Sequence, residues 1–142
     1  MRFVISTLYA LTAAVVTARI SVISAPSTIA PGVPFTLTAR TTNGLQTTYD
    51  VAIAFGLSPS PSHSHTLDTI LNSFYLGPSK SNVVDNINFT VAIDAQTAKG
   101  VYVLGGASMG LYGVGNSPVL REWNVTVSVG KETGGEWMSS RG

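Results

Sequence analysis

The sequence predicts an all-β protein, a single antiparallel β-sandwich of about seven strands and of immunoglobulin-like type, that follows a cleaved signal peptide. Three observations lead to this prediction. Apolar and polar residues alternate in several segments, clusters of Gly, Pro, Asn and Ser separate those segments, and no stretch after residue 18 keeps the period of a helix.

The first eighteen residues have the composition of a secretory signal peptide. Arg2 supplies a short positive region, residues 3–16 form an apolar run, and small residues lead up to Ala18. We expect cleavage between Ala18 and Arg19. The run is shorter than the ~20 residues that cross a bilayer, and no second run of that length follows, so we expect no integral membrane segment.

The mature chain is predicted to be one β domain over residues 19–129. Phe35, Leu37 and Ala39 alternate with polar neighbours, which is the period of a half-buried strand. The same pattern predicts strands over residues 51–57, 87–93 and 123–129, and weaker alternation adds residues 20–24, 68–76 and 101–111. Residues 130–142 are polar and glycine-rich, and we expect a flexible tail there.

Charge and composition exclude several classes of protein. Eight Lys+Arg against seven Asp+Glu leave a net charge of +1, without the basic surplus that binding to nucleic acid needs. The absence of cysteine excludes disulfides, thiolate metal sites and a cysteine nucleophile. A chain of this size buries enough surface, roughly two thirds of the unfolded total, to fold without disulfides.

The chemical motifs do not assemble into an active site, and we expect no enzyme and no cofactor. Residues 106–110 match G-x-S-x-G around Ser108, but that hydrolase motif needs a histidine later in the chain, and both histidines come earlier. His63 and His65 are spaced as a metal-binding pair, yet a third ligand is missing, and their Ser/Pro-rich surroundings favour a solvated loop. No pair of carboxylates has a spacing that selects it for glycoside hydrolysis.

Two sequons fall on the polar faces of predicted strands. Asn88-Phe89-Thr90 and Asn124-Val125-Thr126 both satisfy N-x-[ST]. In a secreted chain, Asn88 and Asn124 are therefore either N-glycosylated or unmodified surface residues.

Aromatic residues offer the remaining binding candidates. Tyr75 and Tyr112 stand beside predicted turns, where they either project toward a partner or pack over the end of the sandwich. Trp137-Met138 is an apolar pair in the tail. It is either a short linear motif that docks on a partner or part of a terminus without a function. An exposed platform for sugars is the alternative use of the aromatics Tyr49, Tyr75, Tyr102, Tyr112 and Trp123.

An ordered set of segments resembles the necrosis-inducing secreted protein family of fungal effectors. The set comprises Arg19-Ile20-Ser21-Val22, residues 25–39, residues 51–57, Tyr75-Leu76-Gly77-Pro78, Leu111-Tyr112-Gly113 with Pro118-Val119-Leu120, and residues 123–130. The resemblance covers nearly the whole mature chain, and the His63/His65 loop and the tail lie outside it.

The resemblance implies a secreted, non-enzymatic protein. Family members are described as suppressing pattern-triggered plant immunity by binding host receptor-associated kinases, and some also trigger plant cell death. The alternative left open is a secreted cell-surface or carbohydrate-binding module of the fungus itself. An aligned, solvent-facing row of aromatics would favour this module, and flat edges of mixed residues without such a row would favour the effector.

Overall fold

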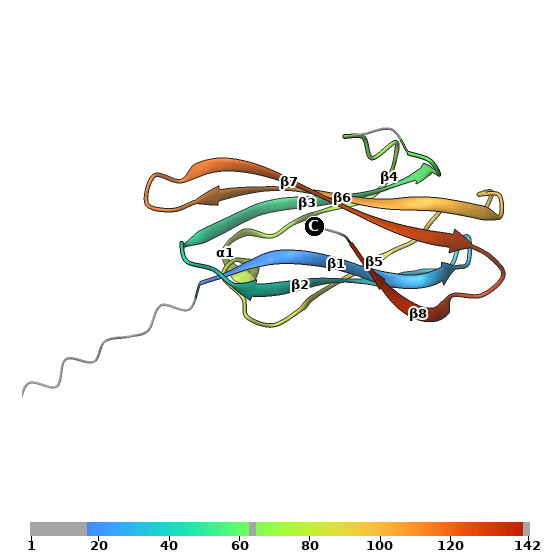
Figure 1. Ribbon diagram of the computed structural model, residues 1–142, viewed down its shortest axis with the longest axis horizontal. Helices are drawn as coiled ribbons and strands as arrows, with labels where there is room; N and C mark the ends of the chain where they lie inside the picture. Colours follow the sequence, from blue (N-terminus) through green and yellow to red (C-terminus); the bar gives the residue numbers. More distant parts are fainter. Residues whose placement is uncertain (1–16, 63–64, 141–142) are drawn as a thin grey trace, which may run out of the picture.

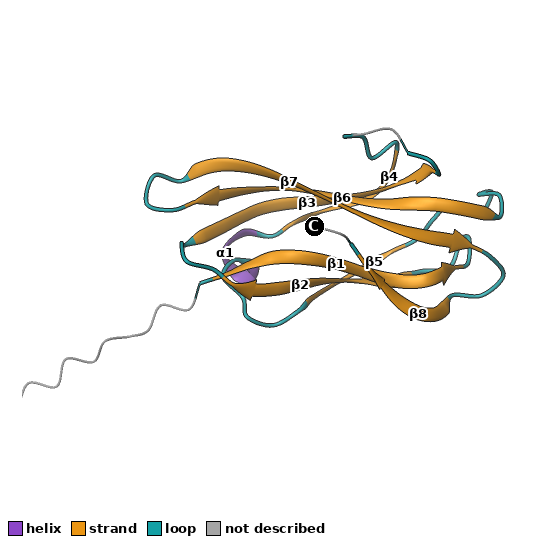
Figure 2. Ribbon diagram, in the orientation of Figure 1, coloured by secondary structure: helices purple, strands orange, loops and turns teal. Residues whose placement is uncertain are grey.

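The computed structural model describes residues 17–62 and 65–140, which form eight strands and one short helix (Figures 1 and 2). The elements in chain order are β1 (Ala18–Ile29), β2 (Phe35–Asn43), β3 (Thr48–Pro59), β4 (Thr69–Tyr75), α1 (Gly77–Lys80), β5 (Ile87–Val91), β6 (Gly100–Tyr112), β7 (Ser117–Val129) and β8 (Gly134–Ser139). All seven strands expected from the sequence are present. Most of the predicted signal peptide, residues 1–16, lies outside the described residues, so its cleavage stays a prediction.

The strands follow one hydrogen-bonded path, β4-β3-β6-β7-β1-β2-β5, and β8 pairs with β1 beside it. Figure 1 shows β3, β6 and β7 on one side of the core and β1, β2, β5 and β8 on the other. The all-β class is confirmed. The path approaches a barrel, however, and does not form two clearly separate sheets of immunoglobulin type.

Strand β1 joins the two layers and breaks the predicted antiparallel pattern. Its first half pairs with β2 as far as Ser24, and Thr28 and Ile29 then pair in parallel with β7. Register shifts after Ile20 and Pro26 mark where this long strand bends. A strand that bends in this way leaves its first neighbour and reaches the opposite layer.

The alternating apolar residues fill the space between the layers. Leu37 and Ala39 are fully buried, as the strand period predicts. Phe55, Phe74 and Phe89 meet there with ring centroids 4.9–6.1 Å apart, in the tilted and edge-on arrangements that aromatic pairs prefer. These contacts hold the two layers together and fix which side chains face outward.

The prediction of a flexible tail over residues 130–142 has to be corrected, because residues 134–139 form strand β8. The pairing with β1 includes Ser24↔Ser139 and Pro26↔Trp137. The Ser140 N–H donates to the Ile23 carbonyl at 2.8 Å, and the Ile23 N–H donates to Ser140 Oγ at 3.0 Å. Backbone groups along β1 need hydrogen-bond partners, and β8 supplies them although its own side chains are mostly exposed. The folded domain therefore continues to Ser140.

Candidate functional site

Strands β4, β3, β6 and β7 present one broad face to solvent, which we call the outer face. Directly paired residues share a face of the sheet, so the strand register identifies its members. One row runs Tyr75, Ala52, Met109 and Leu120, and the next runs Ser73, Ala54, Ala107 and Glu122.

The outer face is apolar at its centre and carries little charge in its two rows. Ala52, Ala54 and Ala107 form a floor, and Met109 (41% exposed) and Leu120 (80% exposed) rise beside it around a shallow hollow of about 260 Å³. Among the described residues of the two rows, Glu122 is the one that carries charge. Small residues flanked by larger apolar ones give a surface on which another protein can pack.

Tyr75 lies at the rim of this face. Its side chain is 67% exposed, and its hydroxyl lies 3.3 Å from the Tyr49 hydroxyl, within hydrogen-bonding distance. This hydrogen bond is the main cause that raises the pKa of Tyr49 above its usual value. Tyr75 is therefore exposed in the same row as Ala52, which lines the apolar hollow, and no pattern in the sequence connects Tyr75 with that hollow.

The loop between β3 and β4 crosses the other half of the outer face. Gly56 and Gly105 are direct cross-strand partners, and Leu67 lies over both of them. His65 Nδ1 lies 2.6 Å from Glu122 Oε2. His65 is solvated, as predicted, but the loop is also packed against the sheet. His63 lies outside the described residues, and within the described ranges no three His, Asp or Glu side chains gather as a metal site would require.

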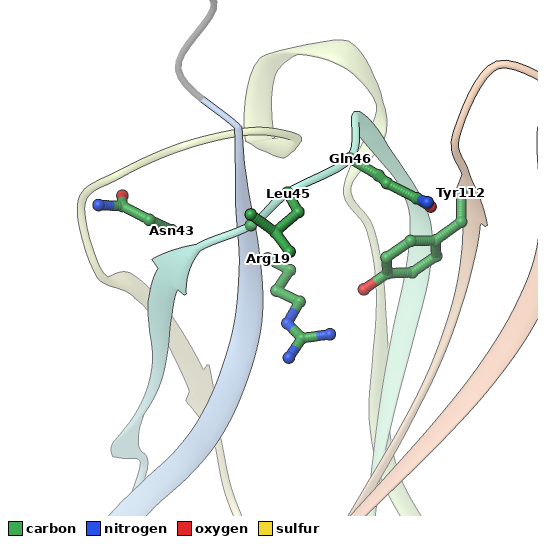
Figure 3. A pocket seen from close by; sticks show the side chains of 6 residues that line it. Arg19, Asn43, Leu45, Gln46 and Tyr112 are labelled. Atoms are coloured by element: carbon green, nitrogen blue, oxygen red, sulfur yellow. The ribbon is translucent and has the colours of Figure 1, made fainter.

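Tyr112 occupies a different place, at the end of the molecule where β1 begins and where the β2–β3 and β6–β7 hairpins turn. A cavity of about 510 Å³ lies there, lined by Arg19, Asn43, Gly44, Leu45, Gln46 and Tyr112. Figure 3 shows the side chains of Arg19 and Tyr112 extending into the same space. The Tyr112 hydroxyl is buried without a hydrogen-bond partner, and the Arg121 guanidinium lies 5.0 Å from the centre of its ring.

The neighbourhood of this cavity also contains a buried acid. Asp50 is 7% exposed, and burial raises the pKa of its carboxyl, while the nearby Arg121 acts in the opposite direction with a smaller effect. The predicted cleavage would place the new α-amino group on Arg19, at the cavity. It would also remove Thr17, whose carbonyl accepts the Gly44 N–H at 2.8 Å.

The other sequence candidates are placed as follows. Asn88 and Asn124 are both exposed on their strands, which fits the predicted sequons without testing their modification. Ser108 is buried within the continuous strand β6, so residues 106–110 do not form the sharp turn of a hydrolase. Trp123 is core, with its Nε1–H donating to the Ser21 carbonyl at 3.0 Å.

Comparison with known proteins decides the family. The sequence matches the Nis1 family over residues 16–128. The chain belongs to the Nis1 family. "Necrosis-inducing secreted protein 1" of Colletotrichum orbiculare is 41% identical over 125 residues, which cover 87% of this chain and 77% of that protein. The protein of the same name from Colletotrichum higginsianum is 41% identical over 129 residues, 90% of each chain. This Nis1 protein is therefore a secreted protein, as its sequence predicted.

Two solved structures are distant neighbours of this chain. Superoxide reductase (neelaredoxin) from Ignicoccus hospitalis superposes with a TM-score of 0.44 at 14% sequence identity, covering 80% of both chains. A variant of that enzyme gives 0.47 at 15% identity, again over 80% of both chains. Values this low carry no inference about the activity of the Nis1 protein. No helix in the described part of the chain has the length and apolar character to cross a bilayer.

Proposed function

We propose that this Nis1 protein is a secreted effector that suppresses pattern-triggered plant immunity by binding host receptor-associated kinases through its outer face. Membership of a family whose relatives are named necrosis-inducing secreted proteins supports the effector class. The choice of kinases as partners comes from the family resemblance. The proposed inhibition is non-catalytic. When the outer face binds a kinase, it covers part of the kinase surface and blocks it without any chemical reaction.

One observation carries the choice of surface. Tyr75, Met109 and Leu120 are exposed around an alanine floor, on a sheet whose opposite side is packed core. Protein interfaces combine a flat apolar centre, depleted of charge, with aromatic and methionine side chains as anchors. A rigid sheet presents these anchors with little entropy to lose on binding.

The arrangement of aromatics favours this function over the carbohydrate-binding alternative. Among the described residues of the outer face, Tyr49 and Tyr75 form a single pair, and Trp123 and Tyr102 belong to the core or pack against it. A sugar platform needs several exposed rings in line, which the described residues do not provide.

The test is a binding titration against the cytosolic domains of plant immune co-receptor kinases, with cell-wall polysaccharides as a parallel ligand. Leu120→Asp places a charge on the apolar rim, and Ser128→Asp places the same charge on an exposed position of the same strand, away from the hollow. Burial of a leucine side chain contributes about 1.5–3 kcal/mol, so Leu120→Asp should weaken kinase binding at least about tenfold while Ser128→Asp does not. Binding to polysaccharide alone would refute the proposal.

A further inference from the structure

Two hairpin tips at the end of the molecule where β1 begins expose aliphatic side chains completely. Leu45, in the β2–β3 turn, is 104% exposed, and Val114, in the β6–β7 turn, is 103% exposed. Single exposed aliphatic residues are ordinary on protein surfaces. Here two fully exposed ones lie on neighbouring turns and form one apolar surface. We call residues 44–47, residues 113–114 and Arg19 the tip surface.

A hydrogen bond links the two tips, because the Gly113 N–H donates to the Thr47 carbonyl at 2.9 Å. Within the β6–β7 turn, the Asn116 N–H donates to the Gly113 carbonyl at 3.2 Å. A hollow of about 600 Å³ lies between them, and Leu45, Gln46, Gly113 and Val114 are among the residues that line it. Thr17 also lines this hollow and would be lost on the predicted cleavage. Leu45 and Val114 are therefore presented together on a fixed base.

The charge behind the tips is positive. Arg19 lines the adjoining cavity, and among the described residues that line the two hollows it alone carries charge. Arg121 lies against Tyr112, and its guanidinium donates to the Ile20 carbonyl at 3.4 Å. The nearby carboxyl of Asp50 is only 7% exposed, so an anionic group that approaches the tips meets the exposed Arg19 first.

We propose that the tip surface docks this protein on a lipid bilayer that carries anionic headgroups. Leu45 and Val114 enter the boundary between headgroups and acyl chains, and Arg19 binds a headgroup phosphate at the adjoining cavity. Apolar side chains combined with basic ones bind such surfaces reversibly, by burial of apolar area and by attraction to anionic lipid.

A bilayer fits these tips better than a protein partner does. Anchors at protein interfaces are mostly Trp, Tyr and Arg, and leucine and valine are under-represented among them. Two convex aliphatic tips need no shaped pocket in a fluid boundary layer. The two surfaces use different residues, because the tips are turns, whereas the Met109–Leu120 row of the outer face lies three residue pairs along the hairpin from Tyr112↔Ser117. The inference does not rest on kinase binding.

The experiment uses the protein as secreted by an expression host, with its N-terminus verified by mass spectrometry. Sedimentation with vesicles of phosphatidylcholine, with and without phosphatidylserine, measures partitioning. The variant Leu45→Ser/Val114→Ser removes both tips, and Val33→Ser/Val101→Ser is its matched control, because Val33 (51%) and Val101 (53%) are exposed elsewhere. Arg19→Gln tests the charge.

We expect the protein to bind the anionic vesicles, and the tip variant to lower partitioning about tenfold or more, while the control variant binds as the parent does. Arg19→Gln should reduce the preference for phosphatidylserine, and added salt should do the same. Absence of binding by the parent, or equal binding by parent and tip variant, would overturn the proposal. So would a dimer in size-exclusion chromatography that the tip variant dissociates, because a second copy would then cover the tips.

Discussion

Gly56→Ala should detach the β3–β4 loop from the outer face. A Cβ at Gly56 would lie 2.4 Å from the Leu67 carbonyl oxygen and 2.6 Å from the Leu67 Cβ, so the loop backbone itself has to move. The change exposes part of the half-buried Leu67 side chain, and full burial of a leucine contributes about 1.5–3 kcal/mol. It also breaks the exposed His65–Glu122 contact, which contributes about 0.2–1 kcal/mol. We expect a loss of about 2 kcal/mol in the free energy of unfolding, which corresponds to a fall in Tm of roughly 5–10 °C.

Gly105→Ala is the matched comparison, because the one close contact of its Cβ would be with the end of the Leu67 side chain, at 2.9 Å, and its other neighbours lie at 3.6 Å or more. That end can rotate away, and alanine gains about 0.5–1 kcal/mol over glycine within a strand, so we expect little net change. Urea unfolding measures both variants, and limited proteolysis reads whether the loop has opened. Equal stability of Gly56→Ala and the parent, with a protected loop, would refute the packing of Leu67 on the glycine pair.

Two further predictions concern buried polar groups. Because burial raises the pKa of Asp50 in the folded state, the stability that this group contributes is present at low pH and is lost as the pH rises through its folded pKa. Asp50→Asn should therefore stabilise the protein more at pH ~7 than at pH ~3.5, near the ordinary Asp value, and an equal effect in urea titrations at the two pH values would contradict this. Ser140→Ala leaves the buried Ile23 N–H without its side-chain partner and should cost about 1–3 kcal/mol in thermal or urea unfolding, whereas a mobile tail would make it neutral.

The strands could be predicted because burial on one side imposes a period of two on the sequence. Phe35, Leu37 and Ala39 show it, and so does the end of β7. Strand β8 could not be found in this way, because its side chains are mostly exposed and its pairing depends on the backbone of β1. The parallel pairing of Thr28 and Ile29 with β7 could not be predicted from the sequence either, because it depends on where β1 bends.

The candidate surface was predictable only in part. Tyr75 stood out beside a turn, but Met109 and Leu120 have no signal of their own until the register of β3, β6 and β7 places them in the same row. Gly56 and Gly105 are far apart in the sequence, and only their pairing explains why Leu67 fits above them. Side-chain alternation identifies faces, and pairing decides which residues share one.

Oxidative footprinting with and without a host kinase domain tests the central claim most directly. Met109 on the outer face and Met138 on β8 are 41% and 40% exposed, so the free protein should oxidise at both. Binding through the hollow of the outer face predicts that the kinase domain protects Met109, together with Tyr75. Met138 lines a separate hollow with Asn124 and Thr126 farther along β7, and it should be protected less. Protection of Met138 while Met109 stays reactive, or protection of neither residue in a saturated complex, would contradict the account.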